Sequence, residues 1–164
     1  MKNHLQLLII ISIFLMFSCN KSDDNIQIKQ LKIDIVPGSG GLMYSTSTTR
    51  GLSFETSNLY IGFNKNNYVN CKSIIFEGCL AVYYNPIQAK VHTDTCYLEL
   101  FNLTDSTIIA KSILCTTSYS PIWLKSQNII SDFPNKPIDL TVRLRTFYEG
   151  YVVNFTSASL YLDF

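Results

Sequence analysis

The sequence predicts an all-β protein built as a sandwich of two antiparallel sheets. From about residue 57 onward, short segments of alternating apolar and polar residues follow one another, separated by clusters of Asn, Asp, Gly, Pro or Ser. Beyond the first 18 residues, no stretch of ten or more has the period of about 3.6 residues that marks a helix. Hydrophobic residues make up 47% of the chain. One face of a single sheet could not bury them all, so two sheets must face each other.

The first half of the domain is expected to contain three main strands. Residues 31–36 alternate Leu and Ile with Lys and Asp, and the Pro-Gly-Ser-Gly-Gly run at 37–41 ends this strand. A Ser/Thr-rich loop follows. Apolar residues then alternate in 59–63 and again in 74–80, and Asn85-Pro86 turns the chain.

The second half is expected to consist of strands joined by short turns. Residues 96–101 form a strand whose hairpin loop is the Asn-Leu-Thr-Asp-Ser run at 102–106, and 107–117 return as one strand. Later strands are expected within 122–130, 140–144 and 151–164, with a Glu-Gly turn at 149–150 before the last. In the strand 140–144, alternation turns Val142 and Leu144 to the core and Thr141 to solvent.

The first 18 residues resemble a lipoprotein signal peptide. A short polar start is followed by the apolar run 5–17, which is too short for a comfortable membrane span. Cys19 comes one residue after that run, as in the lipobox of bacterial lipoproteins, although Met16 replaces the commoner Leu. The resemblance implies that Cys19 becomes an acylated N-terminus, carrying chains such as palmitate, and that residues 19–30 are a tether. The Lys-Ser-Asp-Asp run after Cys19 also resembles the export tag of surface lipoproteins in Gram-negative bacteria.

The mature domain, residues 31–164, carries further motifs in a recognisable order. They are Ile-Ile-Phe-Glu-Gly at 74–78, Tyr-Leu-Glu-Leu-Phe-Asn-Leu-Thr-Asp at 97–105, Ile-Ala-Lys-Ser at 109–112, Trp-Leu-Lys-Ser at 123–126, Leu-Thr-Val-Arg-Leu-Arg-Thr at 140–146 and Ser-Ala-Ser-Leu at 157–160. This order resembles jelly-roll modules of bacterial extracellular and phage-associated proteins, akin to galactose-binding-like and carbohydrate-binding sandwiches. The resemblance spans about residues 55–164. It implies a single jelly-roll β-sandwich and brings no catalytic residue with it.

Charge excludes several classes of partner. The chain has 13 basic and 12 acidic residues, and removal of the signal with Lys2 leaves 12 of each. No global field remains to attract nucleic acid. His92 is the one histidine of the mature chain, which disfavours a histidine-rich metal site. We expect no cofactor, and the scattered acids do not indicate a structural calcium site.

The four cysteines of the domain are Cys71, Cys79, Cys96 and Cys115. An exported domain permits two disulfides, but four free cysteines used as small hydrophobic residues are an equal alternative. Alternation turns Cys79 and Cys115 outward and Cys96 inward. If a bridge forms, Cys79–Cys115 is therefore favoured, provided that their strands are neighbours.

Catalytic constellations are weak. A glycosidase needs two carboxylates flanking the bond, and the candidates are Glu55, Glu77, Glu99 and Glu149. Alternation places Glu77 and Glu99 on outward faces, where solvated glutamates are ordinary. We therefore expect a protein that is not an enzyme.

Aromatic residues are the stronger signal, at 13% of the chain. Tyr83 and Tyr84 are consecutive, so at least one should be exposed, and Tyr148 and Tyr151 flank the expected turn at 149–150. Trp123 is expected in the core. The leading hypothesis is a surface-exposed, lipid-anchored outer-membrane module that binds glycan through these four tyrosines. The alternative is a structural or adhesive subunit that binds protein partners and no small ligand.

Overall fold

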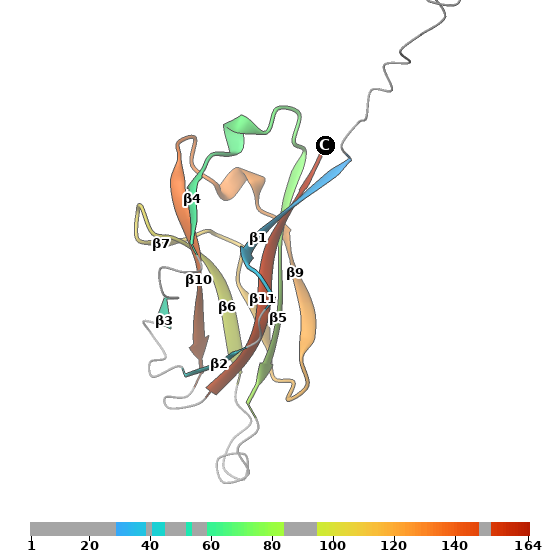
Figure 1. The fold of residues 1–164 in the computed structure, drawn as a ribbon, viewed down its shortest axis with the longest axis vertical. Helices are drawn as coiled ribbons and strands as arrows, with labels where there is room; N and C mark the ends of the chain where they lie inside the picture. Colours follow the sequence, from blue (N-terminus) through green and yellow to red (C-terminus); the bar gives the residue numbers. More distant parts are fainter. Residues whose placement is uncertain (1–28, 39–40, 45–51, 54–58, 84–94, 148–151) are drawn as a thin grey trace, which may run out of the picture.

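The computed structural model describes residues 29–38, 41–44, 52–53, 59–83, 95–147 and 152–164, and within these ranges it consists of two antiparallel sheets (Figure 1). Sheet A contains β1 (Gln30–Val36), β2 (Gly41–Tyr44), β5 (Ser73–Val82), β9 (Ile122–Asn128) and β11 (Val152–Asp163). Sheet B contains β3 (Leu52–Ser53), β4 (Tyr60–Phe63), β6 (Cys96–Asn102), β7 (Thr107–Ile108), β8 (Leu114–Thr116) and β10 (Ile138–Thr146). Two short 3₁₀ turns, η1 (Lys65–Asn67) and η2 (Ile130–Asp132), connect strands of the two sheets.

The strand order is that of a jelly roll. Sheet A runs β1-β11-β5-β9, with β2 also paired to β11, and in sheet B β10 pairs with β4 and with β6, which in turn pairs with β8. Eight strands define this order: β1, β4, β5, β6, β8, β9, β10 and β11. If they are renumbered 1 to 8 in chain order, the strand order of sheet A is 1-8-3-6 and that of sheet B is 2-7-4-5. The chain is therefore an all-β jelly-roll sandwich, as the sequence predicts.

The core lies between the sheets and is filled by alternate residues of the long strands. Phe76 and Leu80 of β5 are fully buried, and so is Leu100 of β6 in the other sheet. Val142 and Leu144 of β10 are also buried, which confirms the facing expected for that strand. Burial of this apolar surface is the main source of stability, at roughly 25 cal/mol per Å².

Alternation fails as a guide to exposure on the outer faces, those turned away from the opposite sheet. Thr141, Glu77 and Glu99 were expected in solvent, but their exposed fractions are 1%, 8% and 1%. Long neighbours across the strands cover them: Glu99 lies beneath Arg143 and Arg145, to which it is bonded. The alternation of residues within one strand does not show which side chains of a neighbouring strand will lie over them.

Two predicted strands are also interrupted. The expected strand 107–117 is divided into β7 and β8 by a turn in which Lys111 has a φ of 59°. This turn lets Ser112 reach the core, where its hydroxyl accepts a hydrogen bond from Leu100 N. In β4, Gly62 has a φ of 72°, so Ile61 is 74% exposed while Phe63 is buried.

The two ends of the sandwich differ. The chain enters β1 at the end where β11 finishes, and Phe164 N donates to Lys29 O there (Figure 1). At the other end Tyr83 N donates to Val152 O, and β10 finishes just before Phe147. Within the described residues, no helix has the length and apolarity needed to span a membrane.

Candidate functional site

The outer face of sheet A carries the most exposed large aromatic side chain among the described residues. Trp123, on β9, is 60% exposed and lies opposite Cys79 of β5. The expectation that Trp123 belongs to the core is therefore wrong. β9 lies at the edge of sheet A, and alternation turns Trp123, Lys125 and Gln127 outward.

A polar cluster lies next to this ring. The carboxylate of Glu77 accepts from Lys125 Nζ at 2.9 Å and from the hydroxyl of Tyr161. Lys125 Nζ also lies 5.4 Å from the centroid of the Tyr161 ring. Burial, and then the hydrogen bond to Glu77, raises the pKa of Tyr161, while the hydrogen bond to Glu77 raises the pKa of Lys125.

The polar cluster continues across β11 to β1. Asp34 accepts from Lys32 Nζ at 2.8 Å and from Ser159 Oγ at 2.7 Å, and these bonds lower the pKa of Asp34. We define the Trp123 face as Lys32, Asp34, Glu77, Cys79, Trp123, Lys125, Ser159 and Tyr161. Its two lysines pair with its two acids, so the face is neutral, rich in hydrogen-bonding groups and bordered by an exposed indole.

Of the four predicted ligand-binding tyrosines, Tyr83 is the one that the structure describes. It is 41% exposed, directly after β5, and Tyr119 is 42% exposed near the same end of the sandwich. Tyr84, Tyr148 and Tyr151 lie outside the described residues. Sequence reasoning weighed Trp123 as a sugar-binding residue but favoured the core for it, and it did not select Tyr161. The alternation Trp-x-Lys-x-Gln in β9 was the signal that could have placed Trp123 on the surface.

Glu77 and Glu99, the two candidate carboxylates that the structure describes, do not form a glycosidase pair. Glu77 lies on the outer face of sheet A and Glu99 on the outer face of sheet B, each bonded to basic side chains. Glu55 and Glu149 lie outside the described residues, as does His92. Within the described ranges, no group of three or more His, Cys, Asp and Glu side chains is placed to hold a metal ion.

The four domain cysteines are free thiols in this structure. Cys79 belongs to β5 in sheet A, whereas Cys115 belongs to β8 in sheet B and is exposed. The two strands belong to different sheets and do not pair, so the condition for the favoured Cys79–Cys115 bridge is not met. Cys96 is fully buried, as alternation predicts, and Cys71 donates to Ser73 O at 3.2 Å.

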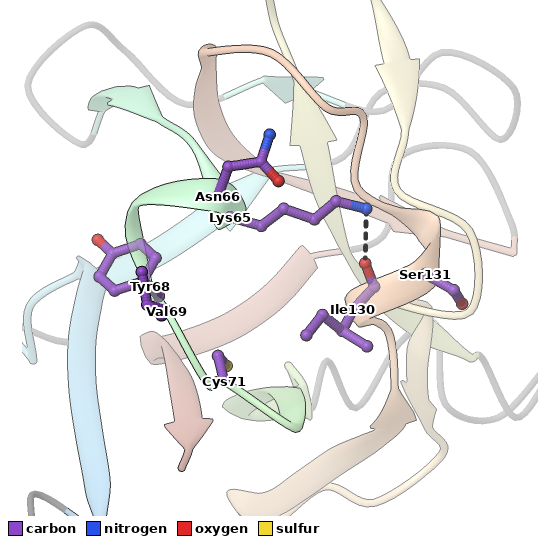
Figure 2. Close-up of a pocket in the computed structure, with 7 residues that line it drawn as sticks. All are labelled: Lys65, Asn66, Tyr68, Val69, Cys71, Ile130 and Ser131. Atoms are coloured by element: carbon purple, nitrogen blue, oxygen red, sulfur yellow. Dashed lines mark hydrogen bonds between the residues drawn. The ribbon is translucent and has the colours of Figure 1, made fainter.

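A cavity of about 500 Å³ opens between η1 and η2, at the end where the chain enters β1. Figure 2 shows the side chains around it: Lys65, Asn66, Tyr68, Val69, Cys71, Ile130 and Ser131. Lys65 Nζ donates to Ile130 O at 3.2 Å and to Phe133 O at 2.6 Å. These two hydrogen bonds connect η1 to η2. Burial raises the pKa of Tyr68 to about 12. The polar groups here stabilise the end of the sandwich and do not converge on the cavity as a ligand site would require.

No protein-family model matches the chain, and neither does any curated protein. Among solved structures it is similar to a xylan-binding module, CBM15, at 12% identity over 81% of this chain and 95% of that one, with a TM-score of 0.45. It is similar to a C-terminal family 22 carbohydrate-binding module from Clostridium thermocellum, at 10% identity over 85% and 89% of the two chains, with a TM-score of 0.39. Infectious bursal disease virus, Gx strain, is similar at 11% identity over 82% of this chain and 31% of the viral one, with a TM-score of 0.43.

Proposed function

We propose that this protein is a membrane-anchored extracytoplasmic module that binds a neutral glycan on the Trp123 face. The exposure of Trp123 beside a neutral hydrogen-bonding cluster carries the proposal. An indole ring that is 60% exposed on a sheet leaves apolar area in water. A sugar ring that stacks on it removes that area from water, while Glu77, Lys125 and Asp34 offer hydrogen bonds to hydroxyl groups.

The rigidity of the sheet favours binding. The backbones of β5, β9 and β11, which carry Trp123, Glu77, Lys125 and Tyr161, pair directly, so ligand binding requires no ordering of these strands. Because the face carries no net charge, its affinity for a neutral glycan should hardly change with salt.

Trp123 is also the single tryptophan of the chain, so its fluorescence reports directly on the site. A glycan array with the detergent-solubilised protein would supply a neutral oligosaccharide, which is then titrated while the Trp123 emission is recorded. We expect a saturable change and protection of Trp123 from acrylamide quenching. Trp123→Ala should abolish binding, measured by calorimetry, without lowering the melting temperature.

Phe147→Ala is the matched control, because Phe147 is also an exposed aromatic residue but follows β10 of sheet B. It should leave the affinity unchanged. The double variant Tyr148→Ala with Tyr151→Ala tests the tyrosines that the sequence proposes. Equal losses in the Trp123 and Phe147 variants would contradict a site on the Trp123 face. Binding of no neutral sugar together with a co-purifying protein would favour the structural or adhesive alternative.

That alternative draws on one observation of its own. In the described part of sheet A, β9 pairs with β5 on one side and ends the strand order on the other. Its free edge, with Trp123 beside it, is a surface on which a protein partner could add a strand.

Anchoring through Cys19 is the second part of the proposal, and the apolar run 5–17 ahead of that cysteine supports it. The chain enters β1 at the end of the sandwich where β11 finishes (Figure 1). Several acyl chains on one residue hold a protein lastingly on a bilayer. Cys19→Ser should abolish palmitate labelling and release the protein from the outer-membrane fraction. An unchanged membrane fraction would contradict the anchor.

A further inference from the structure

The outer face of sheet B holds a compact cluster of charges that the proposed function does not use. Glu99 of β6 lies opposite Arg143 of β10, and Arg145 lies two residues further along the same strand. The carboxylate of Glu99 accepts from Arg143 Nε at 2.8 Å and Nη2 at 2.7 Å, and from Arg145 Nε at 2.6 Å. We call these three residues the Arg–Glu–Arg cluster.

The cluster has an excess of positive charge. Among the residues that the structure describes, two guanidinium groups share one carboxylate, so these three side chains carry one net unit of positive charge. The Glu99 side chain is 1% exposed, and those of Arg143 and Arg145 are 16% and 21% exposed, so water screens this charge only in part. Asp139, further along β10, is engaged elsewhere: its carboxylate accepts from Gly62 N at 2.9 Å.

Both guanidinium groups are held in fixed positions. Arg145 Cζ lies 3.6 Å from the centroid of the Tyr97 ring, and Arg143 Cζ lies 4.9 Å from that of Phe101. Stacking and the bonds to Glu99 set the planes of the two groups. Arg145 uses only Nε toward Glu99, so both of its Nη groups remain as donors, and Arg143 keeps Nη1. The Arg143 and Arg145 side chains are 16% and 21% exposed, so each is partly open to solvent.

Fixed N–H donors on a cluster with a net positive charge suit an oxyanion, because a planar guanidinium binds a carboxylate or sulfate through paired hydrogen bonds. We propose that the Arg–Glu–Arg cluster binds the oxyanion of an acidic sugar, so that the two outer faces of the sandwich take glycans of different charge. The carboxylate of a uronic acid and a sulfate ester share this chemistry. The site is independent of the Trp123 face.

The experiment titrates the full-length, detergent-solubilised protein with a galacturonic acid oligosaccharide and, separately, with a sulfated one, by calorimetry. We expect at least one to bind, with an affinity that falls steeply between roughly 0.05 and 0.5 M salt because the contact is ionic. Preference for one probe identifies the oxyanion. The affinity for an uncharged oligosaccharide of the same length should be the same with and without Arg145.

Arg145→Gln is the decisive variant, because it leaves Glu99 paired with Arg143 and brings the cluster to zero charge. Loss of a charge-assisted contact should weaken acidic-sugar binding about ten- to hundredfold. Lys72→Gln removes one positive charge from an exposed position just before β5, outside the Trp123 face and the cluster, and serves as the control, with the acidic-sugar affinity retained. Arg145→Lys keeps the charge but loses the planar guanidinium with its paired N–H donors. This variant should fold normally and bind the acidic sugar more weakly than the wild type. It takes the place of Arg145→Gln if that variant unfolds.

Three results would overturn the proposal: neither acidic probe binds at low salt, Arg145→Gln and Lys72→Gln weaken binding equally, or Arg145→Lys folds and binds as tightly as the wild type. Trp123→Ala should leave acidic-sugar binding intact. A negative result for acidic-sugar binding at the cluster can therefore be told apart from a negative result for neutral-glycan binding on the Trp123 face.

Discussion

At the scale of single residues, side-chain exposure is decided by neighbours across the sheet as much as by position along the strand. Thr141 and Trp123 both point outward by alternation, yet Thr141 is 1% exposed and Trp123 is 60% exposed. Thr141 lies on β10, between β4 and β6, whereas Trp123 lies on β9 at a sheet edge. A central strand is covered from both sides and an edge strand from one.

The first prediction compares three substitutions. Leu144→Ala empties a fully packed core position and should lower the free energy of unfolding by about 2–5 kcal/mol. Thr141→Ala removes a buried side chain on the outer face and should lower it by about 0.5–3 kcal/mol. Thr107→Ala, at an exposed position of β7, is the control and should stay within about 0.5 kcal/mol. Urea denaturation measures all three. A neutral Thr141→Ala would restore the solvent-facing assignment that the sequence suggested.

At the scale of elements, the two sheets approach closely where β5 carries a glycine. Gly78 faces Leu98 of β6, and a Cβ atom at residue 78 would fall directly on Leu98 Cδ2. It would also lie 3.4 Å from Ser157 O of the neighbouring strand β11. Glycine is therefore required here for close approach of the sheets. Its backbone φ angle is one that other residues also adopt.

The second prediction follows from this contact. Gly78→Ala should lower the free energy of unfolding by about 1–3 kcal/mol, because Leu98 is fully buried and cannot move into solvent. Shortening the opposing side chain should relieve the clash. The double variant Gly78→Ala with Leu98→Ala should thus be less destabilised than the sum of the two single variants, as measured in a double-mutant cycle. Strict additivity would mean that the two residues do not meet.

At the scale of the whole molecule, carboxylates join distant parts of the chain. Hydrogen bonds from Lys32 and Ser159 lower the pKa of Asp34, those from Lys136 and Asn102 lower the pKa of Asp105, and those from Ser73 and Gln30 lower the pKa of Asp163. A lowered pKa in the folded state means that the unfolded chain binds protons more readily. The stabilisation is therefore complete above the ordinary value of 3.8 and is lost as the pH falls below it.

The third prediction is an acid limit to stability. Urea denaturation between pH ~6 and ~2.5 should show a free energy of unfolding that declines most steeply below about pH 4. Asp163→Asn keeps the shape of the side chain but removes its titration, so the decline should be shallower in that variant. An identical pH profile for the variant would show that the bonds from Ser73 and Gln30 do not stabilise the fold.

The sequence alone determines the strand class, the positions of most long strands and the inward faces of β5, β6 and β10, because these depend on a two-residue period within one segment. That Cys19 is an anchor and that aromatic residues bind a ligand stay predictions from the sequence. Strand order, and with it the pairing of Glu77 with Lys125 and of Glu99 with two arginines, depends on contacts between segments far apart in the chain. Only the tertiary structure decided that Trp123 is exposed, that Glu77 and Glu99 are covered, and that Cys79 and Cys115 lie in different sheets. Each of these depends on which strand lies beside which, and no local pattern encodes that.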